Sequence, residues 1–319
     1  MTRLNAVVVA AACLLICSVA SAQVQRSFVA SYGSDANTAT NCGFANPCRG
    51  FTAAHSVTNS GGEVVALDAA GYGAVTITKA ITITANPGFY AGISASSGNA
   101  VTVNTTGLVV LRALSINGIG GAIGVSVTAA GGRVLIENCV ISGFTTAGVK
   151  TSVAAAVRVT DSVFRANNDG IFVQGGAFLD VFRSKFTNNT QTGVWVNGEI
   201  DGTNTTGTVT ESSATGNGTS LGAPGFTATS FSGATGAARL TVTNSTSAGN
   251  GSGLFVGGAG AGQISILTTS RNTVSGKGTG LFNNGNAGGG TSILQTLGDN
   301  IVRNNGTETS GTLTSIGGT

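Results

Sequence analysis

Short apolar stretches alternate with glycine, asparagine, serine and threonine over most of the chain. In residues 132–150, GRVLIENCVISGFTTAGVK, apolar and polar positions alternate as they do along a strand that buries one face. Asn138, Gly143 and Gly148 interrupt the alternation, and residues of these types favour turns. The segment therefore predicts two or three short strands joined by turns.

This pattern of strands and turns repeats along the sequence. A glycine followed by an apolar residue marks each repeat, and these glycines are spaced by 22 residues (Gly148 to Gly170) to 32 residues (Gly193 to Gly225). A second motif, such as ENCVI in residues 137–141, lies upstream of the glycine. An internal period of this length indicates a solenoid of stacked units.

One repeat is too small to bury its own apolar side chains, whereas stacked repeats bury them against each other. Each strand then pairs with its counterpart one coil along, at about 4.8 Å, and equivalent residues form inward columns. We expect roughly eight to ten coils between residues 63 and 309, with about 22 to 30 residues in each. The predicted columns are Ile136, Val159 and Val181 in one case and Ile141, Phe164 and Phe186 in the other.

Residues 23–62 differ from the repeats and are expected to cap the first coil. In NCGFANPC, turn-forming residues separate Cys42 from Cys48, and an oxidising compartment would favour a disulfide between them. Metal binding is the alternative, but no histidine or second cysteine pair lies nearby to complete a site. Residues 51–62 predict a short helix that ends at the Gly61-Gly62 pair, with His55 as a partly buried helix residue.

The two ends of the chain are expected to lie outside the solenoid. Residues 1–22 have a basic start, an apolar run and an Ala-Ser-Ala cleavage pattern, which predict a signal peptide and a secreted or periplasmic protein. A lipoprotein is the less favoured alternative, because Ile16 is too bulky to precede a lipidated Cys17. The last residues, 310–319, are polar and rich in glycine, and we expect a flexible tail.

Composition narrows the classes of protein further. Only 8% of the residues are charged and 51 are glycine, which leaves little material for helices. The regular apolar spacing argues against disorder. Because the signal peptide contains Arg3, the mature chain would carry a formal charge of only +2, from 14 basic and 12 acidic residues. No nucleic-acid partner and no membrane insertion after signal cleavage are therefore expected, and the oligomeric state is left open.

These repeats resemble right-handed parallel β-helix proteins of the pectate-lyase-like superfamily, in particular exported bacterial members without a defined activity. The resemblance rests on residues 61–83, GGEVVALDAAGYGAVTITKAITI, and on ENCVISGF, TDSVFRANNDGIFV and FRSKFTNNTQTGVWV, and it covers about residues 28–306. It implies an all-β, right-handed parallel β-helix over residues 63–309. It does not imply one activity, because this architecture includes lyases, hydrolases, esterases and adhesins.

A lyase on this fold would need carboxylates that hold Ca²⁺ and a basic residue that removes a proton. Stacking of neighbouring coils predicts that Arg158 meets Asp180 and that Asp161 meets Arg183. Such pairs are more typical of contacts between adjacent strands at the surface than of a catalytic site. We therefore expect no cofactor, and Ca²⁺ only if the lyase alternative holds. The candidate cluster consists of Glu137, Arg158, Asp180, Asp161, Arg183 and Lys185.

Four aromatic residues follow the glycine-apolar pairs at a position that should point outward. An outward aromatic row could stack against sugar rings, meet a partner protein, or lie under a loop such as residues 199–206. A register shift by one residue would instead turn the whole row into the core. The row consists of Phe172, Trp195, Phe255 and Phe282.

Three hypotheses for function remain at this point. The favoured one is an exported binding or surface-interaction protein, with a glycan or another cell-surface partner bound by the aromatic row. The second is a polysaccharide lyase, or a hydrolase, that acts on acidic glycans. The third is a purely structural extracellular rod.

Overall fold

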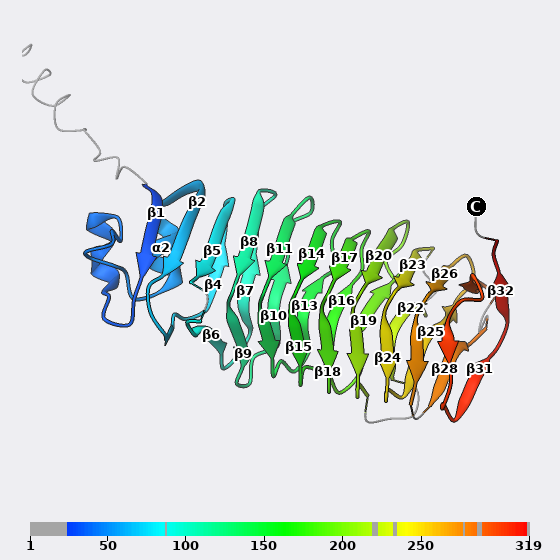
Figure 1. The fold of residues 1–319 in the computed structure, drawn as a ribbon. Coiled ribbons are helices and arrows are strands. Elements are labelled where there is room, and N and C mark those ends of the chain that lie inside the picture. The colour runs from blue at the N-terminus through cyan, green and yellow to red at the C-terminus, as the bar shows by residue number, and fades with distance from the viewer. Residues whose placement is uncertain are drawn as a thin grey trace, which may run out of the picture.

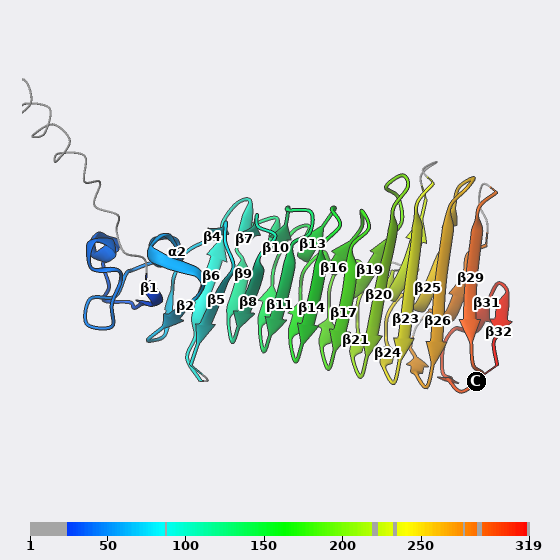
Figure 2. The same ribbon diagram turned by 90° about the horizontal axis from the view of Figure 1, so that it is seen from above.

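The protein is an elongated solenoid of parallel β-strands (Figure 1). The computed structural model describes residues 24–86, 88–218, 223–231, 235–276, 278–285 and 289–317, so the predicted signal peptide lies outside the described residues. The strands form three sheets, and successive strands of the chain pass from sheet A to sheet B to sheet C and then back to sheet A. Figure 2 shows the same stack of coils from above. The expected parallel β-helix is confirmed.

Sheet A is the largest of the three sheets in the described residues. Its twelve strands are β1 (Val24–Val29), β2 (Thr58–Ala66), β5 (Ile81–Ala85), β8 (Leu108–Arg112), β11 (Arg133–Glu137), β14 (Ala156–Thr160), β17 (Phe178–Phe182), β20 (Asn204–Thr210), β23 (Ala237–Thr243), β26 (Ile264–Ser270), β29 (Thr291–Thr296) and β32 (Leu313–Ser315).

Sheets B and C each have ten strands in the described residues. Sheet B consists of β3 (Ala70–Gly71), β6 (Ala91–Ala95), β9 (Ser115–Gly118), β12 (Val140–Ser142), β15 (Val163–Arg165), β18 (Lys185–Thr187), β21 (Ser213–Thr215), β24 (Thr246–Ala248), β27 (Thr273–Ser275) and β30 (Ile301–Val302). Sheet C consists of β4 (Val75–Ile77), β7 (Asn99–Val103), β10 (Ile123–Val127), β13 (Ala147–Thr151), β16 (Asp169–Val173), β19 (Val194–Asn197), β22 (Pro224–Ser230), β25 (Ser252–Ala259), β28 (Thr279–Asn283) and β31 (Thr307–Ser310).

The core consists of apolar columns that run along the axis of the solenoid. Both predicted columns are confirmed, because Ile136 pairs with Val159 and Ile141 pairs with Phe164 in register. The columns continue to Val181 and Phe186, and all six side chains are fully buried. The rings of Phe164 and Phe186 stack with centroids 5.0 Å apart. Cys139 is also buried in the core, as expected, and burial raises the pKa of its thiol to about 12.

Two hydrogen-bonded columns of polar side chains close the turns between sheets. Asn167, Asn189, Asn217 and Asn250 are buried, and the backbone N–H of each of the first three donates to the side-chain oxygen of the next residue in the column. Serines make a second column, in which Ser162 N–H donates to Ser184 Oγ and Ser184 N–H donates to Ser212 Oγ. These bonds satisfy buried donors that no strand pairing reaches.

The cap is built from β1, a 3₁₀ helix (η1, Asp35–Thr40), the disulfide loop and helix α2 (Phe51–Val57). The predicted Cys42–Cys48 disulfide is present, with Cα atoms 4.9 Å apart. His55 is buried, and its Nε2 accepts a hydrogen bond from the Thr78 N–H. Burial and the charge of Lys79 lower the pKa of His55 to about 4.

One detail of the cap helix and one of the C-terminal segment differ from expectation. Helix α2 ends at Val57 and not at Gly61-Gly62, because Thr58 closes it by hydrogen bonds to the Ala54 carbonyl and the chain then continues as β2. The expected tail contains β32, in which Leu313 pairs in register with Leu294 of β29. A leucine that can extend an apolar column therefore orders part of the C-terminal segment.

None of the helices in the described part of the chain is long and apolar enough to cross a membrane.

Candidate functional site

The predicted aromatic row lies on the outer face of sheet C. Phe172 pairs in register with Trp195, Trp195 with Thr227, Thr227 with Phe255, and Phe255 with Phe282. The residues on either side of these positions, such as Val194 and Val196 beside Trp195, are fully buried. Because side chains alternate along a strand, the row points outward, and the register shift that would have buried it does not occur.

Trp195 is half-buried and held in place by neighbours on both sides. Its indole N–H donates a hydrogen bond of 2.6 Å to Thr229 Oγ1 on β22. The Phe172 ring meets the indole edge to face, with centroids 4.8 Å apart, and Lys150 Nζ lies 5.2 Å from the Phe172 centroid. Phe282 supports Phe255 in the same way, at 5.1 Å. Phe172 and Phe282 thus act as supports, and Trp195 and Phe255 offer the surface.

A pocket of about 560 Å³ opens over Trp195 and Phe255. Its size falls within the roughly 300–1,000 Å³ that is usual for ligand sites. Phe231, whose side chain is 51% exposed, forms one wall. Asp169 is the first residue of β16, and Gln191 comes from the turn that leads into β19. Residues 199–206 contribute nothing to the lining, so the loop that could have covered the row does not do so.

Thr227 lies between the two aromatic residues at the base of this pocket. It is only 2% exposed, and within the described residues its hydroxyl has no hydrogen-bond partner. A buried hydroxyl without a partner costs about 1–3 kcal/mol. A group that supplied the missing bond would therefore be favoured at this place.

Asp169 is the one ionisable residue among those that line the pocket. Burial raises the pKa of its carboxyl to about 6, although the Thr192 N–H donates to Oδ1 at 3.2 Å and partly opposes the shift. Asn168 Nδ2 lies 3.5 Å from Oδ2. The carboxyl is thus a weakly acidic hydrogen-bonding group at the edge of an aromatic surface.

The residues proposed for a lyase lie mainly on sheet A and the turn that follows it. Arg158 Nε is 3.8 Å from Asp180 Oδ2, and Thr208 Oγ1 also donates to Asp180 at 2.8 Å. Arg183 binds Asp161 through two hydrogen bonds of 2.8 Å and holds the pKa of Asp161 below its usual value. The expected pairing from coil to coil is therefore present.

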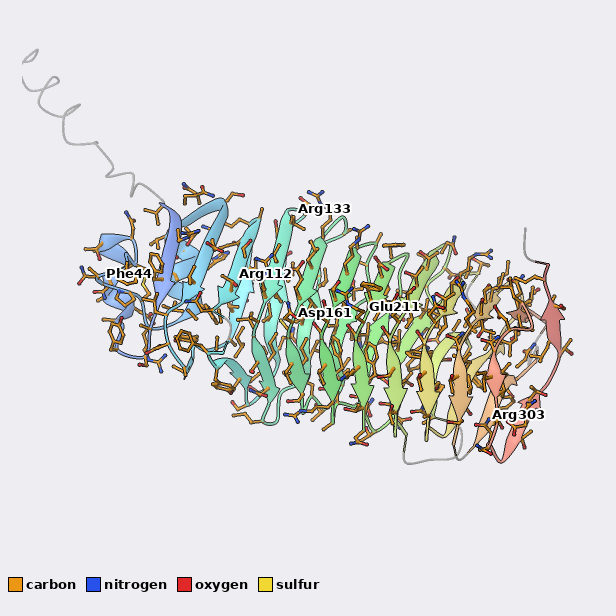
Figure 3. All side chains as sticks on the ribbon, viewed as in Figure 1. Phe44, Arg112, Arg133, Asp161, Glu211 and Arg303 are labelled. Atoms are coloured by element: carbon orange, nitrogen blue, oxygen red, sulfur yellow. A yellow bond between two sulfur atoms is a disulfide. The ribbon has the colours of Figure 1, made fainter. Side chains whose placement is uncertain are left out.

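Two other members of that cluster lie apart from these pairs. Glu137 is bound by Arg112, with 2.8 Å between Nε and Oε2. Lys185 belongs to β18 of sheet B, a different sheet from Arg158 and Asp180. Figure 3 shows Asp161 and Glu211 farther along the solenoid than Arg112; Asp161 follows β14 and Glu211 follows β20 at equivalent positions.

The carboxylates do not form a site that fits Ca²⁺. Glu137, Asp161 and Asp180 are each bound by a different arginine from a neighbouring coil. Across the residues that the structure describes, no three side chains of histidine, cysteine, aspartate or glutamate gather as metal ligands would. The arrangement is that of paired surface charges.

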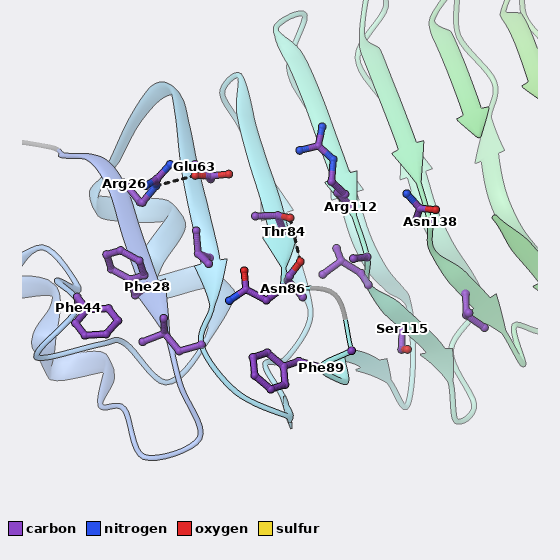
Figure 4. Close-up of a pocket in the computed structure, with 17 residues that line it drawn as sticks. Arg26, Phe28, Phe44, Glu63, Thr84, Asn86, Phe89, Arg112, Ser115 and Asn138 are labelled. Atoms are coloured by element: carbon purple, nitrogen blue, oxygen red, sulfur yellow. Dashed lines mark hydrogen bonds and ion pairs between the residues drawn. The ribbon is translucent and has the colours of Figure 1, made fainter. Parts of the chain in front are cut away.

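A larger pocket, of about 910 Å³, lies at the N-terminal end of sheet A and was not predicted from the sequence. It crosses the outer faces of β1, β2, β5 and β8. Figure 4 shows Phe28 and Phe44 at one end, Arg112 at the other and Phe89 along one edge. An Arg26–Glu63 ion pair of 2.7 Å lies beside Phe28.

A family model described as the right handed beta helix region matches residues 17–210, which is more than half of the chain. The chain belongs to this right-handed β-helix family. No curated protein matches it in sequence.

Among solved structures, this β-helix is similar to the pectate lyase Pel9A, with a TM-score of 0.65 and 16% identity over 92% of this chain and 80% of that one. A rhamnogalacturonan lyase matches with a TM-score of 0.48 and 14% identity, over 88% of this chain and 87% of that one. At 16% identity the likeness to Pel9A shows the shared fold alone.

Several residues of the two pockets in this β-helix escaped prediction. Asp169 directly precedes the Gly170-Ile171 pair, so its place at the start of a sheet C strand could have been found from the repeat. Thr227 occupies the aromatic position of its repeat and could have been found in the same way. Phe231 and Phe44 follow no repeat, and nothing in their spacing predicts where their rings lie.

Proposed function

We propose that this β-helix is an exported protein that binds a neutral glycan on the outer face of sheet C. The observation that carries the proposal is the pocket that combines Trp195 and Phe255 with the unpaired hydroxyl of Thr227. Aromatic faces pack against the C–H faces of sugar rings, and a few fixed polar groups orient the hydroxyls.

The spacing of the surface supports a chain-like ligand. Trp195 and Phe255 lie two coils apart in register, and neighbouring coils are separated by about 4.8 Å. One coil is thus comparable in length with one pyranose unit, so a glycan that runs along the solenoid axis would meet successive residues of the row. The hydroxyl of Thr227 is buried beneath this surface, so a sugar hydroxyl placed between the two rings would pair with it once the side chain turns outward.

The charge of the pocket favours a neutral glycan over an acidic one. Asp169 is the ionisable residue that lines it, and a uronate would meet this carboxylate at neutral pH with no cation of the lining to balance it. Asp169, Gln191 and Thr229 instead offer hydrogen bonds that suit hydroxyl groups.

The lyase alternative receives less support from the geometry. Its carboxylates are bound by arginines, and its members are divided between two sheets. The similarity to Pel9A concerns the fold, and fold alone does not imply activity. Binding without turnover is therefore the function that we favour.

The test is a binding screen on the mature protein with cello-oligosaccharides and xylo-oligosaccharides as neutral probes and polygalacturonate as the acidic probe. Trp195 is the one tryptophan of the chain, so its fluorescence reports on the site directly. We expect saturable changes with a neutral probe, lost in Trp195→Ala and kept in Phe178→Ala, which removes an exposed ring from sheet A.

Other outcomes would overturn the proposal in different ways. Release of unsaturated products from polygalacturonate, lost in Asp180→Ala, would establish the lyase. Neither binding nor turnover with any probe would leave the structural rod as the better account.

A further inference from the structure

We infer that the pocket at the N-terminal end of sheet A is a second binding site, which takes a small aromatic carboxylate. The site shares no residue with the pocket over Trp195 and lies on another sheet. Binding at this site can therefore be tested independently of glycan binding.

The apolar part of the pocket suits a planar aromatic ring. Phe28 and Phe44 meet edge to face with centroids 5.6 Å apart, and the Phe44 side chain is 69% exposed. Phe89 is 46% exposed on another edge, and Val65 of β2, the register partner of Phe28, also lines the pocket. Exposed aromatic residues gathered around one hollow mark a binding surface more often than a solvated face. A guest ring would pack against them in the offset or edge-to-face geometry that aromatic pairs prefer.

The charged part of the pocket suits an anion. Arg26 and Arg112 line it, and Arg26 is paired with Glu63 at 2.7 Å, so Arg112 is the cation of the lining that remains for a ligand. Arg112 is bound to Glu137 through Nε alone, and Glu137 does not line the pocket. In the described part of the chain, the two terminal nitrogens of Arg112 make no hydrogen bond, so they can hold a carboxylate with paired, charge-assisted bonds.

Figure 4 shows Arg112 across the hollow of about 910 Å³ from Phe28 and Phe44, whereas the Arg26–Glu63 pair lies at the same end as Phe28. A ligand must therefore present an aromatic ring at one end and an acid at the other. An aromatic monocarboxylate has this form, whereas a neutral sugar lacks the acid and an aliphatic dicarboxylate lacks the ring.

Calorimetric titration of the mature protein with cinnamate, compared with cinnamyl alcohol as the neutral analogue, tests the inference. We expect saturable binding of cinnamate and at least tenfold weaker binding of the alcohol, because a hydrogen bond to a charged group contributes enough for about a tenfold change in affinity. Arg112→Gln should weaken cinnamate binding about tenfold for the same reason. Phe44→Ala should weaken it severalfold and leave the fold intact, because its ring is largely exposed.

Arg133→Gln is the matched control. Arg133 lies on the outer face of the neighbouring strand β11 and does not line the pocket, so its loss should leave the affinity unchanged. Equal weakening by Arg133→Gln and Arg112→Gln would reduce the effect to general charge and overturn the inference. No saturable binding of cinnamate, or binding that is lost in Trp195→Ala, would overturn it as well.

Discussion

Trp195 Nε1 donates a hydrogen bond of 2.6 Å to Thr229 Oγ1, which lies on the neighbouring strand of sheet C and two positions farther along than the direct partner of Trp195, Thr227. This bond ties the indole ring to the sheet. A ring that is already oriented loses little freedom when a ligand packs against it, which increases affinity.

Thr229→Val removes the acceptor and keeps a similar shape. We expect the free energy of unfolding to fall by about 1 kcal/mol, because a half-buried N–H loses its partner. The emission maximum of the single tryptophan should shift, and the affinity for a neutral glycan should fall severalfold but less than in Trp195→Ala. An unchanged emission maximum and affinity would show that the hydrogen bond does not orient the ring.

Asn189 occupies the middle of the asparagine column. Its Oδ1 accepts hydrogen bonds from both the backbone N–H and Nδ2 of Asn167, at 3.1 and 3.2 Å. Asn189→Leu would leave these buried donors without partners, and we expect the free energy of unfolding to fall by about 3–5 kcal/mol in denaturant titrations. The neighbouring Asn188→Gly is the control, because Asn188 is exposed and has φ 53°, which glycine adopts without strain. Equal losses in both variants would assign the effect to the turn and not to the column.

The columns were predictable because strand alternation and the spaced glycines together fix the register of each coil. Ile136, Phe164 and Trp195 all lie where that register places them. The register alone does not predict the environment of Asp169, because its carboxyl also accepts a hydrogen bond from the Thr192 N–H one coil away. Phe231 and Phe44 follow no repeat, and their rings form pocket walls only through the path of the chain between elements. The charged pairs were predicted, but the N-terminal pocket was not, since it forms where the cap meets the first coils.

Asp169 should make stability depend on pH. Burial raises the pKa of its carboxyl from 3.8 to about 6, so between these values the folded protein holds a proton that the unfolded chain has lost. The contribution of Asp169 to the free energy of unfolding should therefore fall by about 2–3 kcal/mol as pH rises from about 4 to about 6. Asp169→Asn should be more stable than the natural protein at pH above about 6 and equally stable at pH below about 4, as measured by thermal unfolding at each pH. A difference that does not vary with pH would contradict this account.

His55 should have the opposite effect. Burial and Lys79 lower its pKa from 6.5 to about 4, so the unfolded chain takes up a proton first as the pH drops. The contribution of His55 to the free energy of unfolding should fall by about 2–3 kcal/mol as pH decreases from about 6.5 towards 4, which opposes the contribution of Asp169. His55→Gln should remove this dependence while Asp169 still contributes its own, so stability of the variant should rise on acidification. If the slope of the natural protein persists in His55→Gln, another group is responsible.

The Cys42–Cys48 disulfide should stabilise the cap. Closing a short loop restricts the unfolded chain, and we expect Cys42→Ser to reduce the free energy of unfolding by about 2–3 kcal/mol. A reducing agent should lower the melting temperature of the natural protein to about that of the Cys42→Ser variant. It should leave the melting temperature of the variant unchanged. If the reducing agent lowers the melting temperature of both equally, the loss arises elsewhere.

The asparagine and serine columns are directional. In the backbone bonds of both columns, the N–H of an earlier coil donates to a side-chain oxygen of the coil that follows it. The asparagine amides also reach back, because Asn189 Nδ2 donates to the Phe164 carbonyl and Asn217 Nδ2 donates to the Phe186 carbonyl. Each side chain of the asparagine column therefore completes backbone groups of the coil before it. A lengthened molecule made by inserting a coil would need an asparagine on the C-terminal side of each junction, whereas an alanine there would leave the preceding coil with an unmet donor. The side chains of the two columns therefore have a direction along the chain, as the backbone does. Coils can be exchanged only if each one keeps the side chain that bonds the coil before it.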